Sequence, residues 1–193
     1  MPMPTVLRAL LLGVLVSSPL ACSSQPMHQD KANPAPIDLP RFMGSWHVIA
    51  HVPYFGERGH VASRDEYTLR ADGKIAVHYV YQEGFSEPVK TLDSKATVKD
   101  GSGGRRWTTW FFGIVPTKFN ILEVAPDYSW ALINYPGRHL AWVFARGADL
   151  PDAQYDELVT RLRGHGVDTG KLVRVPQLKE QLGKAGFATA KKP

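Results

Sequence analysis

Short runs of alternating hydrophobic and polar residues fill the chain from about residue 46 to residue 146. Alternation with a period of two is typical of strands that bury one face. Turn-forming residues separate the runs, among them Asp72-Gly73, Pro126-Asp127 and Pro136-Gly137. The pattern predicts strands at about residues 46–53, 63–70, 74–83, 87–99, 105–112, 117–125, 129–135 and 139–146.

The period changes after the last of these runs. Leu150-Pro151-Asp152 is typical of a helix start, because proline is tolerated in the first helical turn. Apolar residues then fall at helical spacing on one face, and glycines end the segment; these residues are Tyr155, Leu158, Val159, Leu162, Gly164 and Gly166. We therefore expect an all-β fold: an eight-stranded antiparallel up-and-down β-barrel with one C-terminal α-helix packed outside. Eight strands enclose an interior that holds one small ligand.

The N-terminus is typical of a secretory signal, with Arg8 before a short apolar stretch and small residues up to Ala21. Cleavage before Cys22, the one cysteine of the chain, would expose a thiol for lipid attachment. The segment thus looks like a bacterial lipoprotein signal. Pro19 stands where such signals usually have leucine, so a soluble periplasmic protein is the alternative. Ser23 favours the outer membrane, facing the periplasm, as the site of the anchor.

The chain divides into four predicted parts. Residues 1–21 are the signal peptide, and residues 22–37 form a lipid-anchored tether whose prolines and polar residues cannot bury a core. Residues 38–180 form the barrel domain. Residues 181–193 are expected to be a flexible basic tail.

Charge and motifs exclude several classes of function. The net charge is only +5, and no run of Lys or Arg exceeds two residues, which argues against nucleic-acid binding. The chain has no serine-hydrolase elbow and no phosphate-binding glycine loop, so we expect neither an enzyme nor a cofactor. His47 and His51 are four residues apart on one strand, which places them on its outer face and too far apart for one metal ion.

Three short motifs occur in a fixed order along the chain: Gly44-Ser-Trp46, Asp127-Tyr128 and Arg146. In this order, with a helix behind them, they resemble the signature regions of the lipocalin family. Residues 39–50 and 166–172 further resemble its bacterial and apolipoprotein D branch. The resemblance implies that Trp46 plugs the closed end of the barrel and that Arg146 lies across its indole. It also implies structural roles for Gly44, Asp127 and Tyr128.

Side chains of a strand point alternately to its two faces, so alternation selects the residues that face the interior. In the last strand, an inward-pointing Arg146 implies that every second residue before it, Trp142 included, also points inward. The expected ligand-binding residues are Tyr67, Tyr79, Phe111, Asn134 and Trp142. Such a lining suits a fatty acid or lysophospholipid, which the protein would carry or store during envelope maintenance or stress.

Two other interpretations remain open at this stage. The barrel could hold a lipid or isoprenoid and modify it as an enzyme. Alternatively, aromatic residues of the loop at 53–59 could dock a protein partner, with a homodimer as one form of that interaction.

Overall fold

The computed structural model describes residues 34–111 and 113–192. The predicted signal peptide, Cys22 and most of the tether therefore lie outside the described residues. Within the described part, no helix is long and apolar enough to cross a membrane.

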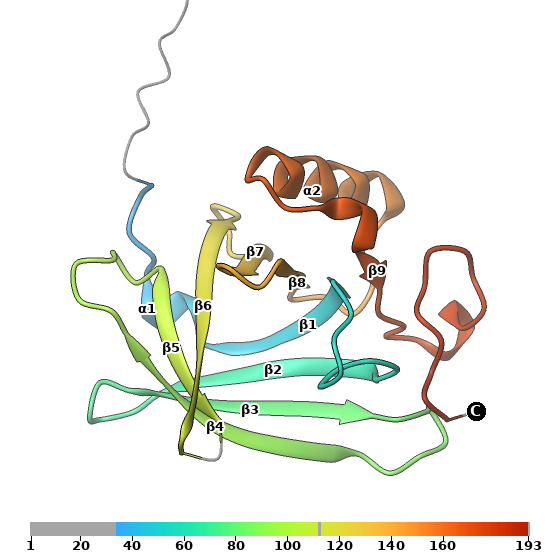
Figure 1. Ribbon diagram of the computed structural model, residues 1–193, viewed down its shortest axis with the longest axis horizontal. Coiled ribbons are helices and arrows are strands. Elements are labelled where there is room, and N and C mark those ends of the chain that lie inside the picture. Colours follow the sequence, from blue (N-terminus) through green and yellow to red (C-terminus); the bar gives the residue numbers. More distant parts are fainter. Residues whose placement is uncertain (1–33, 112, 193) are drawn as a thin grey trace, which may run out of the picture. The chain divides into compact units, whose positions relative to one another are not determined.

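The described chain is built mainly from β-strands, which Figure 1 shows wrapped around one interior. The strands are β1 (Gly44–His51), β2 (Val61–Leu69), β3 (Ile75–Gln82), β4 (Lys90–Val98), β5 (Arg106–Phe111), β6 (Val115–Val124), β7 (Trp130–Tyr135), β8 (Leu140–Ala145) and β9 (Val173–Arg174). Strands β1 to β8 follow the predicted ones, with ends that differ by no more than about three residues.

Each strand from β2 to β7 pairs antiparallel with the next along the chain. Strand β1 pairs with both β2 and β8, which closes the sheet into a barrel. Strand β9 adds to the part of β1 that lies beyond its pairing with β2. The predicted eight-stranded antiparallel barrel is thus confirmed, and closure leaves few unpaired strand edges.

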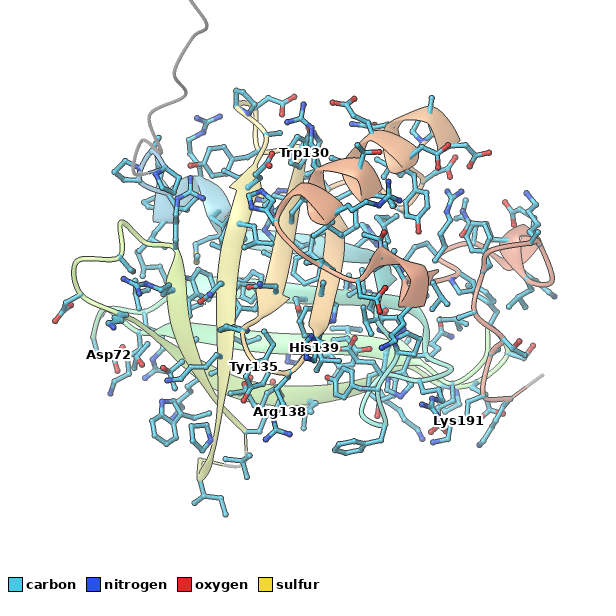
Figure 2. The ribbon with its side chains drawn as sticks, turned by 45° about the horizontal axis from the view of Figure 1, so that its top comes forward. Asp72, Trp130, Tyr135, Arg138, His139 and Lys191 are labelled. Atoms are coloured by element: carbon cyan, nitrogen blue, oxygen red, sulfur yellow. The ribbon has the colours of Figure 1, made fainter. Side chains whose placement is uncertain are left out.

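Helix α2 (Asp152–Gly164) lies outside the barrel, as predicted. Its buried residues Leu158 and Leu162 pack on the outward-facing side chains of β1, β7 and β8, such as Leu132 and Val143. Figure 2 shows Trp130, at the start of β7, close to this helix, where the Arg161 guanidinium lies 5.6 Å from the Trp130 ring centre. The protein consequently has two hydrophobic cores, one inside the barrel and one beneath α2.

A single helical turn closes one end of the barrel. Helix α1 (Leu39–Phe42) begins after Asp38, whose carboxylate accepts a hydrogen bond from the Arg41 backbone N–H at 3.2 Å. The fully buried Phe42 of this helix belongs to the interior core.

The chain is already packed before α1 begins. Ile37 is buried, and its backbone N–H donates to the Gly103 carbonyl at 2.7 Å. The Arg105 guanidinium donates to the Ala35 carbonyl at 2.7 Å. The described end of the predicted tether therefore belongs to the barrel domain, because the turn between β4 and β5 supplies partners for its backbone.

The C-terminal residues also differ from the expectation of a flexible tail. Residues 186–192, here called the C-terminal strap, return to the barrel beside β9, where the Ala188 N–H donates to the Arg174 carbonyl at 2.7 Å. Farther along, the Lys191 N–H donates to Gly59 at 2.8 Å and the Lys192 N–H to Glu83 at 2.7 Å. Glu83 also accepts the Lys191 ammonium at 2.5 Å, so backbone pairing and charge together hold the strap.

Candidate ligand-binding site

Aromatic side chains fill the closed end of the barrel interior. Phe42, Trp46, Tyr67, Trp107 and Phe119 contact one another with ring centres 4.9 to 6.0 Å apart. The Trp46 indole N–H donates to the Phe42 carbonyl at 2.7 Å, which satisfies the one polar group of this buried ring. This end of the interior is therefore a packed plug.

Arg146 covers the plug from outside. Its guanidinium carbon lies 3.8 Å from the centre of the Trp46 ring, which is within cation–π range. The same group donates to the carbonyls of Ser45 and Met43, each at 2.8 Å. Gly44 leaves the space for this arrangement, because a Cβ there would lie 3.3 Å from the Arg146 guanidinium and φ is +92°.

Asp127 and Tyr128 form the turn between β6 and β7 at the same end. The Asp127 carboxylate accepts the Ser129 backbone N–H at 3.0 Å, and Tyr128 has a positive φ of 63°. The Tyr128 hydroxyl accepts the Asp38 N–H at 2.8 Å and so ties this turn to the cap of α1. These contacts are what a structural role requires.

The open half of the interior contains polar groups that alternation alone did not reveal. A β-bulge between Val48 and Ala50 shifts the register of β1 against β8. His51 therefore points into the barrel and is only 3% exposed, whereas we expected it on the outer face. His47, which precedes the bulge, faces outward as predicted and contacts Gln177 at 3.2 Å.

Glu57, from the loop between β1 and β2, is the centre of a hydrogen-bond cluster at the open mouth. Its carboxylate accepts hydrogen bonds from His51 at 2.8 Å, from the Trp142 indole at 2.9 Å and from the Tyr54 hydroxyl at 2.9 Å. Burial would raise the pKa of Glu57, but these hydrogen bonds outweigh it and hold the pKa below its ordinary value. Glu57 is therefore a largely buried anion, with 13% of its side chain exposed and three donors around it.

Asp65 is a second interior carboxyl, placed deeper on β2. It is paired across the sheet with Trp46 and Tyr79, whose side chains belong to the interior core. The Tyr67 hydroxyl donates to Asp65 Oδ2 at 2.9 Å. Burial, together with the negative charge of Glu57, raises the pKa of Asp65 to about 7.

Aromatic rings line the wall above Asp65. His60 stacks on Tyr81 with ring centres 3.8 Å apart, and its Nδ1 lies 2.9 Å from the Tyr79 hydroxyl. Burial lowers the pKa of His60 and keeps the ring neutral at pH 7. Several inward side chains in this half remain only partly buried, namely Tyr81, Leu92 and Trp142. The open half of the barrel is thus less tightly filled than the closed end.

Comparison with known proteins agrees with this geometry. The family model described as "Lipocalin-like domain" matches residues 37–177. The chain belongs to the lipocalin-like family. It is 29% identical over 154 residues to temperature-induced lipocalin-1 of Arabidopsis thaliana, covering 73% of this chain and 80% of that protein. It is 27% identical over 145 residues to the outer membrane lipoprotein Blc of Vibrio cholerae, covering 73% and 83%.

Solved structures give the same fold at low sequence identity. Lobster apocrustacyanin A1 matches with a TM-score of 0.59 and 17% identity, covering 74% of this lipocalin and 81% of that chain. Insecticyanin from the tobacco hornworm Manduca sexta matches with a TM-score of 0.58 and 17% identity, covering 81% and 86%. The fold resemblance that the sequence motifs implied is therefore confirmed.

The lipocalin barrel orients most of the predicted lining residues inward. Tyr67, Tyr79 and Trp142 belong to or pack against the interior core. Phe111 lies four residues after Trp107 on β5, so both side chains point to the same, inward face of the strand, and Phe111 is partly buried.

Asn134 is the exception among the predicted lining residues. Its neighbour Ile133 belongs to the interior core and pairs with Trp142, whereas Leu132 packs in the core beneath α2. Asn134 therefore shares the outer face with Leu132, and its inclusion in the lining was wrong.

The sequence analysis also missed Glu57, Asp65 and His51 as interior residues. A search for apolar inward positions passes over polar groups, and the bulge in β1 hides the orientation of His51. The signal for Asp65 was nevertheless available, because it has the same parity on β2 as the predicted Tyr67. Within the described residues, no group of three His, Cys, Asp or Glu side chains is arranged to hold a metal ion.

Proposed function

We propose that this lipocalin binds a fatty acid or lysophospholipid in the open half of its barrel and carries or stores it. The observation that carries the proposal is the contrast between the two halves of the interior. Trp46 and Trp107 at the closed end are buried almost completely, while Tyr81, Leu92 and Trp142, which pack against the same interior core, are only partly buried. Burial of an acyl chain against these side chains would contribute about 25 cal/mol per Å² of apolar area.

The proposed place of action is the periplasmic side of the bacterial outer membrane, with a lipid on Cys22 as the anchor. Relatives from Vibrio cholerae, Citrobacter freundii and Escherichia coli are named outer membrane lipoprotein Blc, which supports this location. Replacement of Cys22 by Ser tests the anchor: the protein should move from the membrane fraction to the soluble fraction. An unchanged distribution would contradict the anchor and leave the carrier function untouched.

The cargo is tested by incubating the purified protein with envelope lipids and analysing organic extracts by mass spectrometry. One unchanged fatty acid or lysophospholipid per protein is the expected result. A chemically altered lipid would instead support the lipid-modifying enzyme, and an empty barrel would contradict the proposal and favour a protein partner at the mouth loops.

Two adjacent residues of β5 provide a matched pair of variants. Phe111 faces the interior, whereas Trp110 faces outward and is 38% exposed. Phe111→Glu should abolish lipid uptake, because a carboxylate would replace an apolar wall, while Trp110→Glu should bind like the parent protein. Equal uptake by both folded variants would remove Phe111 from the site.

A further inference from the structure

We infer that the barrel interior selects an amphiphile whose buried polar end is a positively charged ammonium group, with Asp65 as the direct partner of that group. The inference rests on the proposed function and selects between its two ligand classes: it favours a lysophospholipid whose head group carries an ammonium over a fatty acid. Four observations on the described residues of the interior carry it: the position of Asp65, the lack of a lysine or arginine partner for it there, the aromatic wall, and a hydroxyl that has no partner among these residues.

Asp65 is a carboxyl with unused capacity for a partner. Tyr67 donates to its Oδ2, and within the described residues Oδ1 has no hydrogen bond. The side chain points inward between Trp46 and Tyr79, and it keeps some exposed surface. A buried carboxylate without a full set of partners is unfavourable, so a ligand that completes the set gains free energy.

Of the two interior carboxyls, Glu57 is paired with His51, and within the described residues Asp65 has no salt-bridge partner. Among the described residues, neither Asp65 nor Glu57 forms an ion pair with a lysine or arginine. The lysines nearest the mouth bond elsewhere, since Lys90 and Lys191 both bind the Glu83 carboxylate. An ammonium group would meet an opposite charge in the interior, whereas the carboxylate of a fatty acid would meet a like charge at low dielectric.

The wall above Asp65 suits a cation. Tyr79 and Tyr81 stack with ring centres 5.1 Å apart, and Tyr54 meets Trp142 edge to face at 6.3 Å. Aromatic faces attract ammonium groups through the ring quadrupole, and this attraction increases when the cation is removed from water. The same rings would also contact the first methylene groups of the ligand.

Ser94 gives an independent sign that the interior is built to accept a polar ligand. Its side chain on β4 points inward in the row that runs from Val77 to Phe111, and it is 9% exposed. Its hydroxyl has no hydrogen-bond partner among the described residues. Buried hydroxyls are normally paired, so this one has a hydrogen bond available for a ligand.

Three probes with the same chain length separate the ligand classes: dodecylamine, dodecanol and dodecanoate. Binding to the purified protein is followed by tryptophan fluorescence at pH 8, where dodecylamine is cationic and dodecanoate anionic. We expect dodecylamine to bind at least about tenfold more tightly than either of the others. In Asp65→Asn this preference should fall to about threefold or less, because Asn is similar in shape but uncharged.

The control variant is Asp93→Asn, which removes a carboxylate from the outer face of β4, where it pairs with His78. It should keep the full preference for the amine. Equal binding of the three probes, tighter binding of the alcohol, or an amine preference that persists in Asp65→Asn would overturn the inference. Failure of all three probes to bind would contradict the carrier function itself. The affinities of the wild-type protein for the three probes test the preference for an amine even if a variant does not fold.

Discussion

Replacing Asp65 by Asn should stabilise the ligand-free protein at alkaline pH and leave its stability nearly unchanged at pH 4. The pKa of Asp65 is about 7 in the folded protein, against an ordinary value of 3.8. Between these values the folded state binds more protons than the unfolded state, so the free energy of unfolding falls as pH rises. Below pH 3.8 both states are protonated, and the contribution of Asp65 to the slope disappears.

The magnitude follows from the size of the shift. A shift of one pKa unit corresponds to about 1.4 kcal/mol, so about three units correspond to a loss of about 4 kcal/mol above pH 7. Asp65 retains some exposed surface, and screening there reduces the expected value to about 2–4 kcal/mol. Asn cannot ionise, so Asp65→Asn should exceed the parent protein in stability by this amount at pH 8.

The assay is urea unfolding of both proteins at pH 4, 5, 6, 7 and 8, without ligand. Other groups also titrate in this window: burial lowers the pKa of His47 and of His60, which makes stability rise with pH. These contributions are common to both proteins and cancel in the difference between them. A difference that stays constant from pH 4 to pH 8 would refute the assignment of Asp65 as a buried, destabilised carboxyl.

Three further substitutions test other parts of the fold. Arg146→Met should lower the free energy of unfolding by about 2–4 kcal/mol, because several charged hydrogen bonds and a cation–π contact disappear. The control Arg138→Met, at the β7–β8 hairpin in Figure 2, should change the free energy of unfolding by less than about 0.5 kcal/mol. Leu158→Ala should cost about 2–5 kcal/mol in the same urea assay, and a smaller loss would mean that α2 contributes little to the barrel. Hydrogen bonds from Lys191 and Lys90 hold the pKa of Glu83 at about 2, so Glu83 is ionised at pH 7 and its charge helps to hold the C-terminal strap. Glu83→Gln should therefore speed proteolysis of the strap at pH 7. Equal proteolysis rates would mean that backbone hydrogen bonds alone hold the strap.

The barrel itself could be predicted because most strands have one solvent-exposed face and one buried face. Strand β3 is an example: Ile75, Val77 and Tyr79 are buried, while the positions between them are partly exposed in the first half of the strand. The helix could be predicted for the same reason at the other period, since Leu158 and Leu162 are its buried residues.

The orientation of side chains could not be predicted where both faces of a strand are buried. In β7, Ala131, Leu132 and Ile133 are all fully buried, because the interior covers one side and α2 the other. With no alternation to follow, the sequence offered no sign that Asn134 faces outward. The bulge in β1 was hidden in the same way, since Val48 and Ile49 are both buried on opposite faces.

The polar interior was missed for a different reason. Parity on β2 correctly assigned Tyr67 to the interior and would have assigned Asp65 as well. Glu57 belongs to a loop, where periodicity gives no information, and only the folded structure brings it to Trp142, 85 residues away. Long-range contacts of this kind depend on the closed topology rather than on any local pattern.

The two ends of the described chain leave the barrel at opposite ends. Ala35 and Ile37 bond to the β4–β5 turn beside the aromatic plug, whereas Lys191 and Lys192 bond to the two loops at the open mouth. Figure 1 shows this separation, with the first described residues and the C-terminus on different sides of the barrel. In a biosensor, immobilisation on the N-terminal side of the barrel would leave the mouth facing the solution. A purification tag fused to the C-terminal strap would instead lie at the mouth and obstruct ligand entry.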